Sequence, residues 1–226
     1  MVKTLLTFAQ MKSPALLLLF IFATVQLSAQ ELMQYAPGFE FREGVYLNFE
    51  QFKNNNPVPK NSIISKFDKS DTEFLPSVLD EKTFSYKDAN DSVQTMSTEN
   101  VWGFSRNGNI FISIDGDYNR IAVLGSLSHF VATITVYYNS MNSPFMNPYY
   151  GPGSMPTTTQ EMRQMMLDFK TGKTMDFTQE NLENILQRDQ RLFEEFNSLK
   201  KSQKKDMLFL YLRKYNEKHP IFFPAE

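Results

Sequence analysis

Short runs of alternating apolar and polar residues, separated by turn-forming residues, constrain the middle of this 226-residue chain most strongly. Asn107-Gly108 separates two such runs, and asparagine followed by glycine readily adopts the positive φ angles of a hairpin turn. The pairs of runs that flank turn residues are 83–86 with 92–96, 101–104 with 110–114, 120–124 with 129–138, and 167–169 with 175–177. Because strands joined by short turns pair antiparallel, this region predicts a central antiparallel sheet built from hairpins and a meander.

After residue 177 the apolar residues recur at intervals of three and four, the period of an amphipathic helix. One helix is predicted over residues 178–199, with a bend near Asp189, and a second over residues 202–219, where Pro220 ends it. The link between them is short, so we expect antiparallel neighbours that cover one face of the sheet. The predicted fold class is α+β: a central antiparallel sheet followed by two C-terminal amphipathic helices, preceded by a signal peptide.

Two short elements are predicted before the sheet. Residues 44–47 read as a strand and residues 49–54 as a helix. Asn48 can cap this helix, because its side-chain oxygen can accept a hydrogen bond from a free helical N–H group.

The first 29 residues have the pattern of a signal peptide. Lys3 and Lys12 precede an apolar run at residues 15–25, too short to span a bilayer of roughly 30 Å comfortably, and Ala29 supplies a small residue at the cleavage site. Residues 30–226 are then a single α+β domain, whether translation starts at Met1 or at Met11. The alternative is that residues 1–29 form a buried N-terminal helix.

Export is therefore expected, to the periplasm, the outer membrane or the extracellular space. After residue 25 no run reaches the roughly 18 apolar residues of a membrane-spanning helix, so no transmembrane segment is expected in the mature chain. The chain has no cysteine, which excludes disulfides, thiolate metal ligands and a cysteine nucleophile. The net charge of -2 does not suggest the dense basic surface of a nucleic-acid-binding domain, so nucleic acid is not an expected partner.

A long segment at residues 139–159 contains four prolines and two glycines, which oppose regular structure. It also contains side chains of the kind that interface cores enrich: Phe145, Met146, Tyr149 and Tyr150. We expect these residues either to contact a partner, an unknown envelope protein or glycan, or to fold back over the sheet as a lid.

The chain has two histidines, His129 and His219, which are too few for a zinc site with three or four protein ligands. Ser128 and His129 could join a catalytic triad only if the fold aligned Asp115 or Asp117 with them, and adjacency in the sequence is no evidence for that. Both histidines are therefore expected to be structural.

Asp115, Asp117 and Asn119 match the first, third and fifth positions of a calcium-binding loop. The match then fails, because Arg120 stands where glycine is needed and Ser126 where a bidentate glutamate is needed. The adjacent carboxylates at residues 80–81 and 194–195 lack the geometry by which a glycosidase spans a sugar bond. The sequence thus predicts no catalytic residue, no cofactor and no metal site.

The signal-peptide end at residues 27–30, the segment 44–52 (GVYLNFEQF) and the segment 167–173 (LDFKTGK) resemble an uncharacterised family of exported Bacteroidetes proteins, a domain of unknown function. Residues 192–196 (LFEEF) and 214–221 (KYNEKHPI) strengthen the resemblance. It implies export and a single domain, and no catalytic residue. Asp91-Ser92-Val93 resembles the acceptor pattern for O-linked glycans on exported proteins of such bacteria, so Ser92 is a candidate glycosylation site.

These observations favour an exported, non-catalytic protein, an envelope accessory or binding module. The alternatives are a carboxylate-based hydrolase acting in the envelope and a structural envelope protein. A hydrolase requires a pocket that holds two carboxylates with shifted pKa values, whereas a partner-binding protein would expose apolar side chains at residues 141–155.

Intact-mass measurement of protein recovered from its native host tests the export prediction. The chain should begin at or near Gln30, because cleavage is expected after Ala29. Recovery of the full-length chain from the cytoplasm would contradict export.

Overall fold

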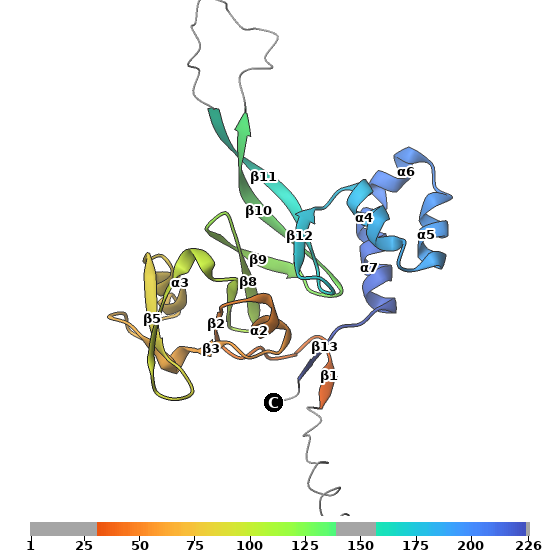
Figure 1. Ribbon diagram of the computed structural model, residues 1–226. Helices are drawn as coiled ribbons and strands as arrows, with labels where there is room; N and C mark the ends of the chain where they lie inside the picture. The colour runs from red at the N-terminus through yellow and green to blue at the C-terminus, as the bar shows by residue number, and fades with distance from the viewer. Residues whose placement is uncertain (1–30, 139–156, 225–226) are drawn as a thin grey trace, which may run out of the picture. The chain divides into compact units, whose positions relative to one another are not determined.

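An eight-stranded antiparallel sheet forms the centre of the fold, and helices follow it in the chain (Figure 1). The structure is a computed structural model that describes residues 31–138 and 157–224. The strands of the sheet are β2 (Gly44–Tyr46), β3 (Val58–Pro59), β7 (Gly103–Arg106), β8 (Asn109–Ile114), β9 (Asp117–Val123), β10 (Leu127–Tyr138), β11 (Thr157–Asp168) and β12 (Lys173–Asp176). Their order is β12-β11-β10-β9-β8-β7-β2-β3. The predicted α+β class with a central antiparallel sheet is confirmed.

Strands β7 to β10 are neighbours in chain order, the predicted meander, and two-residue turns join β7 to β8 and β8 to β9. Asn107 and Gly108 have φ angles of 50° and 70°, the geometry of a type I′ hairpin turn. Asp115 and Gly116 repeat it, with φ angles of 52° and 89°. Turn chemistry visible in the sequence therefore sets the register of this part of the sheet.

The predicted hairpin of residues 83–86 and 92–96 forms outside the central sheet. β5 (Thr83–Lys87) pairs with β6 (Val93–Ser97) and with β4 (Ile63–Ile64) in a separate three-stranded sheet. The helix α3 (Phe74–Leu79) belongs to the same hydrophobic cluster as Phe84 of β5 and Phe104 of β7. A third sheet pairs β1 (Leu32–Gln34) with β13 (Phe222–Pro224). Single 3-10 turns lie at Lys60–Ser62 and Thr98–Asn100.

The short helix α2 (Phe49–Lys53) is fixed in an aromatic core. Phe52 is fully buried and stacks on Trp102, with ring centroids 4.5 Å apart. Phe49 lies 5.7 Å from the ring of Phe169 and covers Gly172 closely, since a Cβ at Gly172 would lie 2.6 Å from the Phe49 ring. These contacts hold α2 against the turn between β11 and β12.

The ribbon formed by β10 and β11 is longer than predicted. The two strands each contain 12 residues and pair along their entire length. The expectation of a loop up to residue 159 is therefore wrong at its end, because residues 157–159 continue the ladder with β10. The rest of that segment, including Phe145, Met146, Tyr149 and Tyr150, lies outside the described residues.

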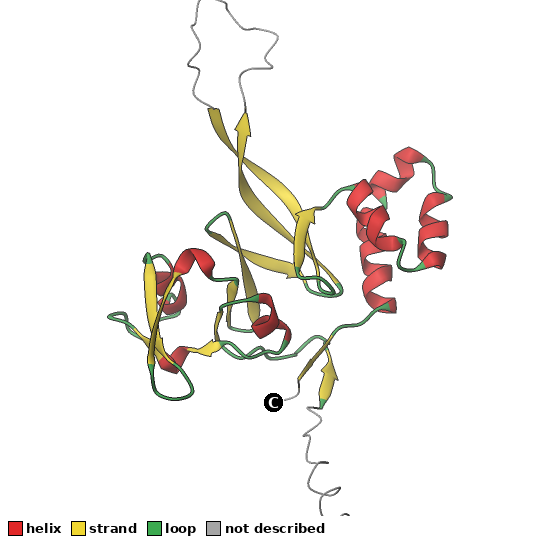
Figure 2. Ribbon diagram, viewed as in Figure 1, coloured by secondary structure: helices red, strands yellow, loops and turns green. Residues whose placement is uncertain are grey.

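Each of the two predicted C-terminal helices is divided in two (Figure 2). The first becomes α4 (Gln179–Leu186) and α5 (Gln190–Asn197), because the Asp189 carboxylate accepts a hydrogen bond from the Leu192 N–H at 3.2 Å and so caps a new helix. The second becomes α6 (Lys201–Asp206) and α7 (Leu208–Lys218). There the Met207 N–H bonds to the carbonyls of both Gln203 and Lys204, a tightened helix end.

The cap predicted at Asn48 forms, and Thr178 caps α4 in the same way. Asn48 accepts a hydrogen bond from the Gln51 N–H at 2.9 Å, and Thr178 accepts one from the Asn181 N–H at 3.2 Å. The C-terminal helices then bury a cluster that contains Leu127 of β10 and Met166 of β11. The helices thus pack against the sheet, as their apolar stripes predict.

Gly103 in β7 is a position where only glycine fits. A Cβ added there would lie 2.2 Å from the carbonyl oxygen of Phe111 in β8. Gly103→Ala should lower the free energy of unfolding by about 1–3 kcal/mol or more, because the neighbouring backbone must move. Urea denaturation measures this change.

Gly108→Asn is the matched control. No atom lies within 4 Å of a Cβ at Gly108, and asparagine tolerates its positive φ of 70°. Equal stabilities of Gly103→Ala and the wild type would contradict the proposed close approach of β7 and β8.

Candidate functional site

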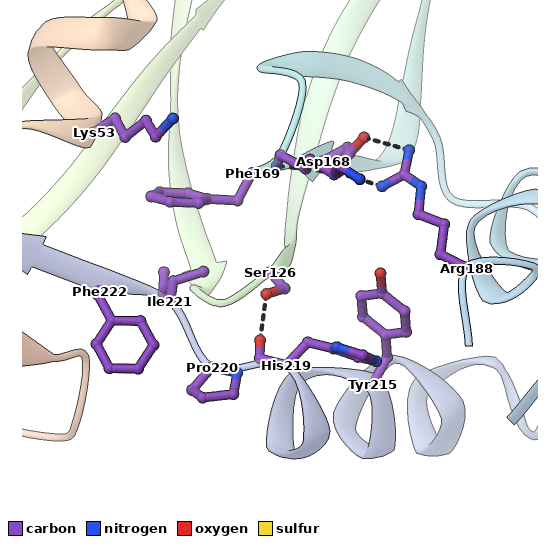
Figure 3. A pocket seen from close by; sticks show the side chains of 11 residues that line it. Lys53, Ser126, Asp168, Phe169, Arg188, Tyr215, His219, Pro220, Ile221 and Phe222 are labelled. Atoms are coloured by element: carbon purple, nitrogen blue, oxygen red, sulfur yellow. Dashed lines mark hydrogen bonds and ion pairs between the residues drawn. The ribbon is translucent and has the colours of Figure 1, made fainter. Parts of the chain in front are cut away.

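A pocket of about 430 Å³ lies where the β11–β12 turn, the α4–α5 corner and the end of α7 meet (Figure 3). Small-molecule sites in proteins have volumes of this order. Its charged or titratable lining residues are Lys53, Asp168, Lys170, Arg188, Tyr215 and His219. Its apolar lining includes Phe169, Ile221 and Phe222. We call this site the basic pocket.

An ion pair between Asp168 and Arg188 ties the last hairpin of the sheet to the corner between α4 and α5. The guanidinium donates two parallel hydrogen bonds to the carboxylate, at 3.0 and 2.8 Å. The Asp168 side chain is 2% exposed and also accepts hydrogen bonds from the Thr171 hydroxyl at 2.7 Å and the Lys170 backbone N–H at 3.1 Å. A carboxylate this buried requires such partners, and the paired geometry with arginine is the strongest form available.

The charge states of Asp168 and Tyr215 follow from this ion pair. Burial alone would raise the pKa of the Asp168 carboxyl, but the hydrogen bonds from Arg188 and Thr171 and the charge of Arg188 outweigh burial and hold the pKa below its ordinary value of 3.8. Burial raises the pKa of the Tyr215 hydroxyl, although the nearby Arg188 charge acts in the opposite direction. At neutral pH Asp168 is therefore ionised and Tyr215 protonated, so neither is poised as a general acid or base.

A second carboxylate, Asp189, connects the end of α7 to the start of α5. Its oxygens lie 2.7 Å from the Lys218 Nζ and 2.8 Å from the His219 Nε2, and its side chain is 6% exposed. The hydrogen bond from Lys218, with further ones from the Leu192 N–H and His219, lowers the pKa of Asp189 to about 2, against the raising effect of burial. This contact fixes the His219 ring beside the basic pocket.

Asn216 attaches α7 to the start of β10. Its side-chain oxygen accepts a hydrogen bond from the Leu127 N–H at 2.7 Å, and its amide donates one to the Leu127 carbonyl at 2.8 Å. Gly125 leaves room for this amide, since a Cβ there would lie 2.5 Å from it. The neighbouring Ser126 donates its hydroxyl to the backbone carbonyl of His219 (Figure 3). Ser126, His219 and Asp189 therefore do not form a chain of nucleophile, base and acid, because the hydroxyl does not face the imidazole.

Lys53 and Lys170 carry the unneutralised charges of the basic pocket. Within residues 31–138 and 157–224, neither ammonium group has a hydrogen-bond or ion-pair partner. Asp168 is bound to Arg188, so it is not available to neutralise them. The contact of Phe49 with Gly172 holds α2, which carries Lys53, against the β11–β12 turn, which carries Lys170. The two ammonium groups therefore line one pocket and give it a positive charge that attracts anions.

The structure keeps apart the residues considered for a catalytic triad. His129 is buried between Phe177 and Phe209, with ring centroids at 5.1 and 4.8 Å, and burial lowers the pKa of its imidazole. Ser128 donates its hydroxyl to a backbone carbonyl three residues earlier in the chain, at 3.0 Å. The Asp115 carboxylate accepts a hydrogen bond from the Thr135 N–H at 3.0 Å. In the described residues, the Ser128 hydroxyl and the Asp115 carboxylate thus contact backbone groups, and the His129 ring packs in the core.

Ser92 lies exposed in the turn between β5 and β6, where its backbone N–H bonds to Asp88 at 3.0 Å. An exposed turn is accessible to a glycosylating enzyme, and modification of Ser92 stays a prediction. Among the residues that the structure describes, no group of three histidine, cysteine or acidic side chains could hold a metal ion.

Sequence reasoning does not single out Lys53, Lys170 or Arg188. Each is one charged residue in a polar segment, and its role depends on neighbours far away in the chain. Lys170 does fall in the segment 167–173 and His219 in the segment 214–221 that carry the family resemblance. The one local signal is Asp189, a carboxylate in the apolar stripe of a predicted helix, where a charge needs a partner.

The architecture and the pocket define an α+β protein with a basic site between its sheet and its C-terminal helices. Residues 44–219 match a family of unknown function, DUF6563, and the chain belongs to this family. No curated protein and no solved structure matches the chain. Every charged residue of the basic pocket, from Lys53 to His219, lies within the matched residues.

None of the helices within the described ranges has the length and the apolar character needed to cross a membrane.

Asp189→Asn tests the contact between α5 and α7 and its pH dependence. Because the pKa of Asp189 falls from 3.8 to about 2 on folding, its stabilising effect is complete above about pH 4 and is lost as the pH falls through 2. The variant should unfold at a midpoint a few degrees below the wild type at pH 7, and the difference should shrink between pH 4 and 2. Thermal unfolding followed by circular dichroism at several pH values measures it.

Asp206→Asn is the matched control, since Asp206 is an exposed residue of α6 and its carboxylate has no partner in the described part of the chain. A difference between Asp189→Asn and wild type that stays constant down to pH 2 would show that the carboxylate charge is not the stabilising feature.

Proposed function

We propose that this chain is an exported, non-catalytic binding module of the cell envelope, whose basic pocket holds the anionic group of a small ligand. The observation that carries the proposal is the pair of unneutralised ammonium groups, Lys53 and Lys170, on one pocket. The envelope location rests on the signal-peptide pattern of residues 1–29, which lie outside the described residues.

The charges around the pocket support an anion as the bound group. The charges of Arg188 and Asp168 cancel, so the two lysines give the pocket lining a net positive charge even when His219 is left out of the sum. Ammonium groups bind phosphate or carboxylate oxygens through charge-assisted hydrogen bonds. Phe169 and Ile221 offer apolar surface for the remainder of such a ligand.

The carboxylates near the pocket do not favour a hydrolase. A glycosidase needs a carboxylic acid with a raised pKa beside a second, ionised carboxylate. Asp168 and Asp189 both have lowered pKa values, because each is bound to a cation. Binding without chemistry is therefore the better supported role.

Phosphate binding tests the basic pocket. Millimolar sodium phosphate should raise the thermal midpoint of the wild type above that in sodium chloride of equal ionic strength, because a ligand that binds only the folded state stabilises it. The Lys53→Gln/Lys170→Gln double variant should lose this specific increase. Its own midpoint without phosphate should be equal to or above that of the wild type, since the substitution removes repulsion between like charges.

Lys205→Gln is the matched control, because Lys205 is exposed on α6 and its ammonium also has no partner among the described residues. Phosphate also stabilises proteins non-specifically, and that part should persist in every variant. An equal response to phosphate in the wild type and the double variant would refute anion binding at this pocket.

A further inference from the structure

A second pocket, of about 470 Å³, lies between the end of α3 and the strands β7, β8 and β9. It shares no lining residue with the basic pocket. Its lining includes Phe104, Phe111, Tyr118, Arg106, Asp80 and Asp117. We call this site the aromatic pocket.

Three rings form one wall of the aromatic pocket. Phe104 and Phe111 are directly opposite in the β7–β8 ladder, and their rings stack with centroids 4.6 Å apart and planes 8° apart. Tyr118 meets Phe104 edge to face at 5.3 Å. Because the Asn107-Gly108 turn fixes this register, the wall is formed before any ligand binds.

The charges of the aromatic pocket are opposite in sign to those of the basic pocket. Arg106 is neutralised, since its guanidinium lies 2.7 Å from the Glu73 carboxylate, donates to the Thr72 carbonyl at 2.9 Å and packs over the Phe111 ring at 5.4 Å. The carboxylates of Asp80 and Asp117 have no hydrogen-bond or ion-pair partner in the ranges that the structure describes. Two free negative charges therefore border an apolar wall.

The hydroxyl of Tyr118 is buried and is not part of the pocket surface. Its oxygen is buried and has no hydrogen bond with any described residue. Burial raises the pKa of this hydroxyl to about 12, so at neutral pH it keeps its proton and can both donate and accept. Because this oxygen has almost no accessible surface, a ligand in the pocket would contact the ring of Tyr118 and not its hydroxyl.

We propose that the aromatic pocket binds a small organic ammonium ligand, whose apolar body packs on the rings of Phe111 and Tyr118 and whose cationic head lies between Asp80 and Asp117. An ammonium group can donate charge-assisted hydrogen bonds to both carboxylates. Because Asp80 and Asp117 are exposed, the bound ammonium group also keeps most of its contact with water. An anion would meet two like charges, and a neutral apolar ligand would leave both carboxylates uncompensated. This site is separate from the one proposed for anions and does not depend on it.

Isothermal titration calorimetry with phenethylamine tests this inference, with phenethyl alcohol as the neutral ligand of the same shape. The amine should bind saturably to the wild type, and the alcohol should bind at least tenfold more weakly, since about tenfold corresponds to one charge-assisted contact. Asp117→Asn and Asp80→Asn should each weaken amine binding about tenfold. Asp206→Asn should leave it unchanged.

Tyr118→Phe is a control, because it changes no atom on the pocket surface. The hydroxyl is buried without a partner in the described protein, so its loss should lower neither the thermal midpoint nor the affinity for phenethylamine. The Lys53→Gln/Lys170→Gln variant should bind the amine like the wild type, which keeps this test independent of the anion site. Equal affinities for amine and alcohol, or unchanged affinity in the Asp80→Asn/Asp117→Asn double variant, would overturn the proposal.

Discussion

The buried ion pair between Asp168 and Arg188 is the interaction on which the region around the basic pocket depends. Asp168 ends β11 and Arg188 lies between α4 and α5, so one pair of charges connects the sheet to the helices. At 2% exposure the carboxylate cannot rely on water, and loss of its partner would leave a charge buried and unpaired. The same pair has a chemical consequence. Because the Asp168 carboxylate is already paired with Arg188, it does not neutralise the ammonium group of the neighbouring Lys170.

Local chemistry explains which parts of the fold could be predicted. The Asn107-Gly108 turn and the cap at Asn48 depend on residues a few positions apart, and each forms as predicted. The division of the C-terminal helices was harder to predict. Asp189 occupies a position where the helical periodicity predicts an apolar residue. A buried carboxylate there, which begins a new helix, is stable only because it contacts Lys218 and His219.

Longer-range features lay beyond such reasoning. The hairpin of β5 and β6 has the same local pattern as its neighbours, and nothing in its sequence states that it pairs with β4 instead of joining the central sheet. The length of β11 likewise depends on β10 continuing opposite it. The basic pocket is the feature that sequence reasoning could predict least. Most strands of the central sheet lie between Lys53 and Lys170 in the sequence. The two lysines are brought together by Phe49, which packs where Gly172 has no side chain.

The chemical character of the two pockets follows from which charges the fold pairs, more than from how many the chain contains. With 23 basic and 25 acidic residues the sequence is nearly balanced, and composition alone suggests no binding preference. In the basic pocket Arg188 takes up the charge of Asp168 and two lysines remain; in the aromatic pocket Glu73 takes up the charge of Arg106 and two aspartates remain. In both places an arginine is fixed by a carboxylate, as its planar, multidentate group favours, while the charges left over are on side chains free to meet a ligand. One nearly neutral chain can therefore carry two pockets that prefer ligands of opposite charge. Each ion pair neutralises one basic and one acidic side chain at one place, and the unpaired charges nearby then set the charge of the pocket.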